Sequence, residues 1–460
     1  MNASPFLTAL AKIVGAENVF SDPADLATYA YDAAVLKPNM PAVAVRPLSS
    51  GAMGAVVAFC NEHGIPLTVR GSGTNLSGGT IPLEGGAVLL TNGLNRILEI
   101  NTEDMYAVVQ PGVITAKLAA AVEAKGLFYP PDPGSQAVST LGGNVAENAG
   151  GLRGLKYGVT ADYVMGLQFY DAGGTLIKTG SRTVKCATGY NLKALMIGSE
   201  GTLGVLEEIT LKLIPLPAAR RSLLAIFDDL DKASETVAAI IARHIVPATL
   251  EFLDNFTIRA VESFSHVGLP LEAAAVLLIE VDGHPGQVAE DGQRVEEICR
   301  RRGATGIQVA EDDAQRDRIW AARRSALSAL AKLKPTVVLE DATVPRSRIP
   351  AMVRALQAIA GRFRLAIGTF GHAGDGNLHP TILTDKRDAE EWHRVEAAIE
   401  AIFDEALALG GTLSGEHGTG LAKARYLAKE TGAGAIQLSR AVKRALDPRN
   451  ILNPGKVIGG

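Results

Sequence analysis

Three glycine-rich segments in the first half of the chain restrict its fold more than any other feature. The first, RGSGTNLSGG (residues 70–79), follows a strand-like apolar run, and its glycines allow successive backbone N–H groups to converge on an anion. Its spacing is neither GxGxxG before a helix nor GxxxxGK[ST]. A nicotinamide Rossmann site and a nucleoside triphosphate loop are therefore disfavoured. Taken alone, the segment is equally consistent with a plain hairpin turn.

The other two segments make a ligand-binding interpretation stronger. STLGGNVAENAGG (139–151) is uncharged apart from Glu147, and GSEGTLGVL (198–206) has the same character. Three such segments in one domain favour a long ligand that runs along the backbone. FAD has this shape, with a pyrophosphate in the middle and a flat ring at one end. The surrounding stretch, 129–158, is predicted to be a long functional loop without regular structure.

The rest of the chain predicts an α+β protein of more than one domain. Strands are expected at 42–47, 66–71, 87–91, 97–100 and 106–112, with helices at 50–63 and 115–126. After the proline-rich IPLPAA (214–219), strands alternate with long amphipathic helices, which predicts an antiparallel sheet backed by helices. We expect an FAD-binding domain at 1–217, a substrate domain with a metal hairpin at 218–412, and a segment at 413–460 that returns to the first domain.

Composition narrows the class of protein. The 460 residues carry a formal net charge of −4, which gives no reason to expect nucleic acid or an anionic membrane surface. Cys60, Cys186 and Cys299 form no CxxC pair, which fits a reducing compartment. No apolar run is long enough to span a bilayer. The N-terminal 14 residues are predicted to form an amphipathic helix of the mature protein, so we expect a cytoplasmic location.

Two of the eight histidines flank a tight glycine turn in GTFGHAGDGNLHPTI (368–382). If both flanks are strands, a hairpin makes His372 and His379 face each other, which suits one divalent metal. Glu416, in LSGEHGTG, would add a carboxylate. This donor set suits Zn²⁺, Mn²⁺ or Fe²⁺, with zinc preferred. Two histidines packed in a core hairpin are the alternative, but core packing does not explain Glu416 and His417 between glycines.

These motifs together resemble a known family. The glycine segments resemble the FAD-binding half of the vanillyl-alcohol oxidase flavoprotein superfamily. GHAGDGNLHP and GEHGTG resemble its FAD-linked oxidase branch, which includes D-lactate dehydrogenases, the flavin subunit of glycolate oxidase and D-2-hydroxyglutarate dehydrogenases. The resemblance covers nearly the whole chain. It implies a two-part FAD-binding domain of the vanillyl-alcohol oxidase type and an α+β cap domain. Some members bond the flavin to a histidine in the first loop. Here that loop reads Thr74-Asn75-Leu76, so we expect non-covalent FAD.

The resemblance also implies roles for individual residues. It places the pyrophosphate on Arg70, Gly71, Ser72, Gly73, Thr74, Asn75 and Ser77. It places the flavin and ribityl chain on Pro133, Gly134, Ser135, Ser139, Gly142, Gly143, Asn144, Asn148, Gly150 and Gly151. It assigns further FAD contacts to the third segment and to the tail. These are Glu200, Gly201, Gly204, Val205 (near the adenine) and Asn453 (near the ring). It makes His372, His379 and Glu416 the metal ligands, His417 the general base, and Arg323 the clamp for a substrate carboxylate, with Asp375 and Asn377 shaping the turn.

The function expected from this reading is oxidation of a small D-2-hydroxy acid, D-lactate or glycolate, to the 2-oxo acid by hydride transfer to flavin. Leu339 occupies the position of a basic contact in the 2-hydroxyglutarate branch, which favours a smaller substrate. The electron acceptor could be a quinone, a cytochrome, an electron-transfer flavoprotein or an iron–sulfur subunit. Attachment to the inner face of the membrane through such partners, and a homodimer, are both open.

Three alternatives also remain open. They are a D-2-hydroxyglutarate dehydrogenase, a non-redox transferase of the same superfamily, and a flavin-free metal hydrolase. The hydrolase would leave the three glycine segments unexplained.

Overall fold

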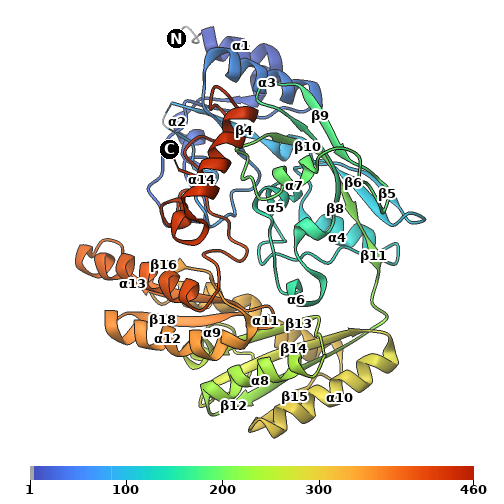
Figure 1. Cartoon of the computed structure of the whole chain (residues 1–460), viewed down its shortest axis with the longest axis vertical. Coiled ribbons are helices and arrows are strands. Elements are labelled where there is room, and N and C mark those ends of the chain that lie inside the picture. The colour runs from blue at the N-terminus through green and yellow to red at the C-terminus, as the bar shows by residue number, and fades with distance from the viewer. Residues whose placement is uncertain (1–4, 84, 460) are drawn as a thin grey trace. The chain divides into compact units, whose positions relative to one another are not determined.

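The computed structural model describes residues 5–83 and 85–459 and divides into two compact units (Figure 1). Unit 1 consists of Met1–Gly150, Val159–Leu216 and Glu416–Gly460. Unit 2 consists of Gly151–Gly158 and Pro217–Gly415. The division places the short segment after Gly150 with unit 2, because Lys156 Nζ and Tyr157 Oη both donate to the carboxylate of Asp282 there.

Unit 1 begins with a four-stranded sheet in the order β1-β2-β4-β3, in which β2, β4 and β3 run parallel. The helix α3 illustrates how its elements are bounded. Ser49 caps the first turn by accepting a hydrogen bond from Ala52 N at 3.3 Å, and Gly64 ends the helix in the left-handed conformation. The elements are α1 (Pro5–Val14), β1 (Val19–Phe20), α2 (Pro23–Ala27), β2 (Val43–Val45), α3 (Ser50–His63), β3 (Leu67–Arg70) and β4 (Ala87–Leu90).

A second, antiparallel sheet of unit 1 has the order β5-β6-β10-β8-β9, and β7 pairs separately with β11. Its elements are β5 (Ile97–Asn101), β6 (Tyr106–Val109), α4 (Thr115–Glu123), β7 (Leu127–Phe128), α5 (Leu141–Glu147), β8 (Val164–Tyr170), β9 (Leu176–Gly180), α7 (Leu192–Met196), β10 (Val205–Lys212) and β11 (Ile214–Pro215). The strands and helices predicted between residues 42 and 126 are thus confirmed. The predicted N-terminal helix is present as α1, and its residues 1–4 lie outside the described residues.

The prediction of an unstructured loop over 129–158 is wrong. The stretch contains α5 and, in unit 2, α6 (Gly154–Tyr157). Thr140 caps α5 by accepting from Gly143 N at 3.2 Å, and Asn148 closes it in the left-handed conformation. Pairs of glycines are poor helix formers, so helix propensity did not predict this short helix.

The C-terminal segment of unit 1 contains α14 (Leu427–Leu446), which is kinked at Gly432. After it, the chain runs beside β3. Leu67 N donates to Ile451 O at 2.7 Å, and Asn453 N donates to Leu67 O at 2.8 Å. The tail therefore extends the parallel sheet at the strand that leads into the first glycine loop.

Unit 2 is built on an eight-stranded antiparallel sheet with the order β15-β12-β14-β13-β18-β19-β16, where β17 also pairs with β19. Its strands are β12 (Ala219–Phe227), β13 (Thr249–Asp254), β14 (Ala275–Gly283), β15 (Gly306–Val309), β16 (Thr336–Leu339), β17 (Ala342–Thr343), β18 (Ala366–His372) and β19 (Asn377–Thr384). Its long helices are α8 (Leu230–Ala242), α9 (Asn255–Ser265), α10 (Pro285–Arg301), α11 (Asp313–Ala331), α12 (Ile349–Phe363) and α13 (Ala389–Ala408).

The helices α9 and α11 cover one face of this sheet. Side chains of both helices share an apolar cluster with alternate residues of the strands, including Leu253 and Phe370. The helices α8, α10, α12 and α13 pack elsewhere on the sheet and on one another. Among the described residues, we find no helix that combines the length and the apolar character needed to span a bilayer.

Candidate active site

The two predicted histidines lie side by side on the β18–β19 hairpin. In the strand register, His379 is opposite Phe370 and His372 is opposite Asn377. We expected the two histidines to lie directly opposite each other, but they are diagonal neighbours. Their ring centroids are 5.0 Å apart and the rings are nearly perpendicular. Asp375 Oδ1 accepts a hydrogen bond from Asn377 N at 3.2 Å, which fits the predicted role of these residues in the turn.

Each of these histidines has a buried carboxylate beside its Nδ1. Glu251 Oε1, on β13, lies 2.7 Å from Nδ1 of His372, and Asp341 Oδ1 lies 3.3 Å from Nδ1 of His379. Both carboxylates are fully buried. A carboxylate at Nδ1 fixes the ring orientation and directs Nε2 toward a bound metal. The ligand atoms of Asp341 and His379 also lie within 4.8 Å of one another, so Asp341 could itself bind a metal.

Arg323 lies on α11 in the same unit. Its Nε donates to Glu251 Oε2, and its guanidinium lies 4.7 Å from the centre of the Phe370 ring. Among the described residues, we find no protein acceptor for its two Nη groups. The side chain is 11% exposed. The paired Nη donors match the geometry of a carboxylate ligand.

The end of unit 2 is fixed close to Asp341. Ser414 Oγ donates to Asp341 Oδ2 at 2.9 Å. A Cβ on Gly415 would lie 2.4 Å from Thr343 Oγ1, so only glycine fits there without a shift. The predicted residues Glu416 and His417 come next in the chain and belong to unit 1. Within that unit, a Cβ on Gly150 would lie 2.6 Å from Glu416 Oε2, so these two residues are in close contact.

In unit 1, the first glycine loop offers backbone donors to a ligand. Among the described residues, we find no protein acceptor for the N–H groups of residues 71–78. Gly73 and Gly78 have φ values of +68° and +77°, which lets the chain fold back on itself here. Such a run of unused N–H groups forms an anion-binding concavity.

Several side chains predicted to bind the cofactor brace this loop in the structure. Arg70 Nη1 donates to Tyr31 O at 2.7 Å and to Thr80 Oγ1 at 3.1 Å. Asn75 Nδ2 donates to Asp32 Oδ2 at 2.7 Å. Because the guanidinium of Arg70 is held by the loop and its neighbours, its contribution to anion binding comes through the loop's shape.

The three glycine segments come together in unit 1. Glu200 N donates to Ala146 O at 2.8 Å, and Asn453 Nδ2 donates to both Gly79 O and Glu200 O at 2.7 Å. Asn144 donates to Thr115 at 2.8 Å. Val205 is fully buried in the apolar core. Pro133, Gly134, Ser135 and Ser139 precede α5, Gly142 and Gly143 are within it, Gly201 and Gly204 follow Glu200, and Gly151 lies in unit 2.

Sequence reasoning missed a buried acid pair between these segments. Glu147 Oε1 accepts from Ser77 Oγ at 3.2 Å, and Glu200 Oε1 accepts from Thr419 N at 2.7 Å and Gly420 N at 3.0 Å. Burial, reinforced by the charge of Glu200, raises the pKa of Glu147 well above its ordinary value. Burial also raises the pKa of Glu200, although the backbone hydrogen bonds oppose the shift.

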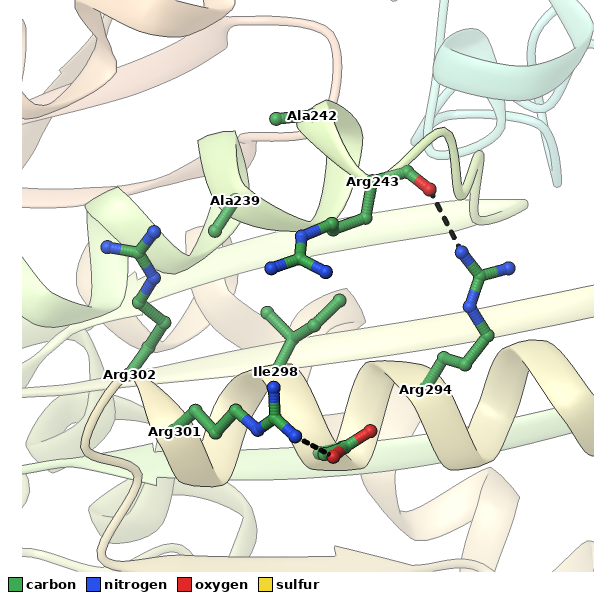
Figure 2. Close-up of a pocket in the computed structure, with 8 residues that line it drawn as sticks. Ala239, Ala242, Arg243, Arg294, Ile298, Arg301 and Arg302 are labelled. Carbon is green, nitrogen blue, oxygen red and sulfur yellow. Dashed lines mark hydrogen bonds and ion pairs between the residues drawn. The ribbon is translucent and has the colours of Figure 1, made fainter.

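A separate surface pocket of unit 2 lies between α8 and α10 and contains none of the predicted site residues (Figure 2). Arg294 Nη2 donates to Arg243 O at 3.0 Å, and Arg301 pairs with Glu297. The pocket is lined mainly by arginines and apolar atoms, with no histidine. It does not resemble the site on the β18–β19 hairpin.

Comparison with known proteins identifies the family. The model of the FAD binding domain matches residues 41–180, and that of the C-terminal domain of FAD linked oxidases matches residues 216–457. Glycolate oxidase subunit GlcD of Bacillus subtilis (strain 168) is 51% identical over 448 residues, which cover 97% of this chain and 95% of that protein. D-lactate dehydrogenase of Anaerostipes hadrus is 37% identical over 429 residues, covering 91% and 89%. The structure of p-cresol methylhydroxylase with substrate bound matches with a TM-score of 0.82 at 19% identity, covering 98% and 96%.

These findings define an FAD-dependent oxidoreductase with the fold of the vanillyl-alcohol oxidase superfamily. Within that class, the chain belongs to the FAD-linked oxidase family. The predicted family, the fold class and the dependence on FAD are confirmed.

Proposed function

We propose that the protein is a metal-assisted dehydrogenase that oxidises a small D-2-hydroxy acid, with D-lactate and glycolate as the first candidates. The observation that carries this proposal is the cluster in unit 2. Two adjacent histidines each have a buried carboxylate at Nδ1, and Arg323 keeps its two Nη groups for a ligand. Relatives named as a glycolate oxidase subunit and as a D-lactate dehydrogenase support the substrate class.

The donor groups of both units fit the two cofactors. The unused N–H groups of residues 71–78 would hold the FAD pyrophosphate. His372 and His379 would hold a divalent metal, with zinc preferred over manganese or iron. Glu416 is the third proposed ligand. Glu416 is two residues after Ser414 in the chain, and Ser414 Oγ donates to Asp341 Oδ2.

The residues of the chain would share the work as follows. Bound FAD supplies the two-electron oxidant, and a bound metal supplies a Lewis acid for the substrate hydroxyl. Arg323 would hold the substrate carboxylate through its two Nη groups and so orient the C2 hydrogen. His417 would accept the hydroxyl proton on a ring nitrogen as general base. Loss of the proton to the base and of the hydride to the oxidant leaves a 2-oxo acid.

The surroundings of the histidines favour a substrate with one carboxylate. Leu339 on β16 is opposite Thr381 on β19, two residues beyond His379, and so faces the same side of the sheet. An apolar side chain offers no partner to a second carboxylate. A D-2-hydroxyglutarate dehydrogenase would need another cation at this place.

Anaerobic mixing of the FAD-loaded protein with D- and L-2-hydroxy acids tests the function. We expect D-lactate or glycolate to bleach the flavin absorbance, with L-lactate and D-2-hydroxyglutarate slower. If none of the hydroxy acids bleaches the flavin, the proposal fails. If a hydroxy acid does bleach the flavin, reoxidation of the bleached protein by quinones, cytochromes, electron-transfer flavoprotein or iron–sulfur proteins would identify the class of acceptor.

A further inference from the structure

Glu251 is a fully buried side chain that contacts both His372 and Arg323 of the proposed unit 2 site. It lies on β13 with 0% exposure of its side chain. Oε1 faces Nδ1 of His372 on β18, at 2.7 Å, and Oε2 accepts from Nε of Arg323 on α11. One carboxylate on β13 therefore links α11 and β18 through residues that are 72 and 121 positions away from it in sequence.

Both oxygens of the Glu251 carboxylate have a partner, one on His372 and the other on Arg323. A rotation of the carboxylate would therefore disturb both contacts together.

The contacts of Arg323 show what this arrangement leaves available. Glu251 takes the Nε edge of the guanidinium, and the Phe370 ring lies 4.7 Å from it. Both hold the plane of the group in place. The Nη edge is then directed away from Glu251, where a substrate carboxylate could be held by two parallel hydrogen bonds.

We propose that Glu251 is a positioning residue shared by the metal ligand His372 and the substrate anchor Arg323, and that it thereby sets metal affinity and substrate affinity together. This inference rests on the proposed function. The other buried carboxylate of the site, Asp341, lies beside Nδ1 of His379 and accepts from Ser414 Oγ.

The chain offers a matched control in Glu280. It is a largely buried glutamate on the neighbouring strand β14, and it also contacts α11, but through neutral donors. Its Oε2 accepts from Ser222 Oγ at 2.6 Å and from Trp320 Nε1 at 3.1 Å. Glu280→Gln therefore perturbs the same sheet and helix without touching the proposed site.

The experiment compares Glu251→Gln with Glu280→Gln in the FAD-loaded protein. Zinc affinity is measured by titration of metal-free samples, and KM and kcat are measured with the hydroxy acid that bleaches the wild type. For Glu251→Gln we expect zinc to bind about 10–100-fold more weakly, and KM at saturating zinc to rise by roughly tenfold or more. Glu280→Gln should leave both unchanged. A folded Glu251→Gln protein with normal zinc affinity and normal KM would overturn the proposal.

Glu251→Asp covers the case in which the glutamine variant does not fold. Aspartate keeps the charge but is one methylene shorter, so it cannot span His372 and Arg323 together. We expect a smaller loss in both zinc affinity and KM, and wild-type values in both would overturn the proposal. The wild type is the reference for the function itself. If it neither binds zinc nor is bleached by any hydroxy acid, the proposed function fails, whatever the variants do.

Discussion

Unit 1 and unit 2 both bury carboxylates beside their proposed ligand groups, but the neighbours of these carboxylates differ. In unit 1, burial raises the pKa of Glu147 and of Glu200, and the charge of Glu200 adds to the shift of Glu147. In unit 2, burial also opposes the ionisation of Glu251, but His372 and Arg323 reverse the shift. Burial alone therefore does not decide whether a carboxylate is ionised, because nearby charges and hydrogen bonds also shift its pKa. Unit 1 presents mainly backbone N–H groups to its ligand, whereas unit 2 presents side chains held by buried carboxylates.

This contrast predicts the largest effect for a histidine of unit 2. His379→Ala should slow flavin reduction by the hydroxy acid on the order of 10³-fold or more, because the metal's contribution of several kcal/mol is lost. FAD should remain bound. Stopped-flow absorbance with metal analysis of the same sample measures both. His393→Ala, an exposed histidine on α13, is the control. If the His379→Ala protein has lost its metal and still reduces its flavin at the wild-type rate, the contrast between the two units is wrong.

A backbone change in unit 1 should have the opposite profile. Gly73→Ala places a Cβ 2.1 Å from Arg70 Nη2 at a φ of +68°, so we expect FAD affinity to fall roughly 10–100-fold, from about 1–3 kcal/mol of strain. The loop has no histidine to bond the flavin, so the affinity is measurable by reversible titration. Gly51→Ala on α3, with open space around it, should leave FAD affinity unchanged. Yellow colour that stays with the acid-precipitated protein would contradict reversible binding.

The buried acid pair should make unit 1 sensitive to pH. A folded pKa above the unfolded one means that stability is highest below the ordinary glutamate range and falls as pH rises through the raised pKa. Glu147→Gln should therefore stabilise unit 1 at pH 8, on the order of 1 kcal/mol, and give no gain at pH 4. Thermal release of FAD, followed by flavin fluorescence, measures this, with the exposed Glu123→Gln as control. A gain that is equal at both pH values would count against the raised pKa.

The smallest effect is expected at the arginine-lined pocket of unit 2. The Arg301–Glu297 pair is exposed, with side-chain exposures of 70% and 59%, and such pairs contribute little. Arg301→Ala should change the stability of unit 2 by no more than about 0.5 kcal/mol. Trp320 and Trp392 are the only tryptophans of the chain and both lie in unit 2, so tryptophan fluorescence in urea reports on this unit. A loss of several kcal/mol would show that the pocket has a structural role.

The sequence allowed the local features to be predicted, while the long-range contacts needed the structure. The strands, the glycine segments and the histidine hairpin have signals within a few residues of each other. Glu251 and Asp341 lie far from His372 and His379 in sequence, and only the strand order brings them together. A charged residue inside the apolar strand TLEFLD was the available signal for Glu251. The helix α5 was missed because its glycines argue against a helix.

Anaerobic flavin reduction with and without metal tests the central claim most directly. The FAD-loaded protein is stripped of metal by a chelator, checked for retained FAD, and mixed with D-lactate or glycolate in a stopped-flow spectrometer. We predict that the metal-free protein keeps its flavin spectrum unbleached and that one equivalent of zinc or manganese restores bleaching. Bleaching of the metal-free protein at the full rate would contradict the claim that the histidines of unit 2 hold a metal for this reaction.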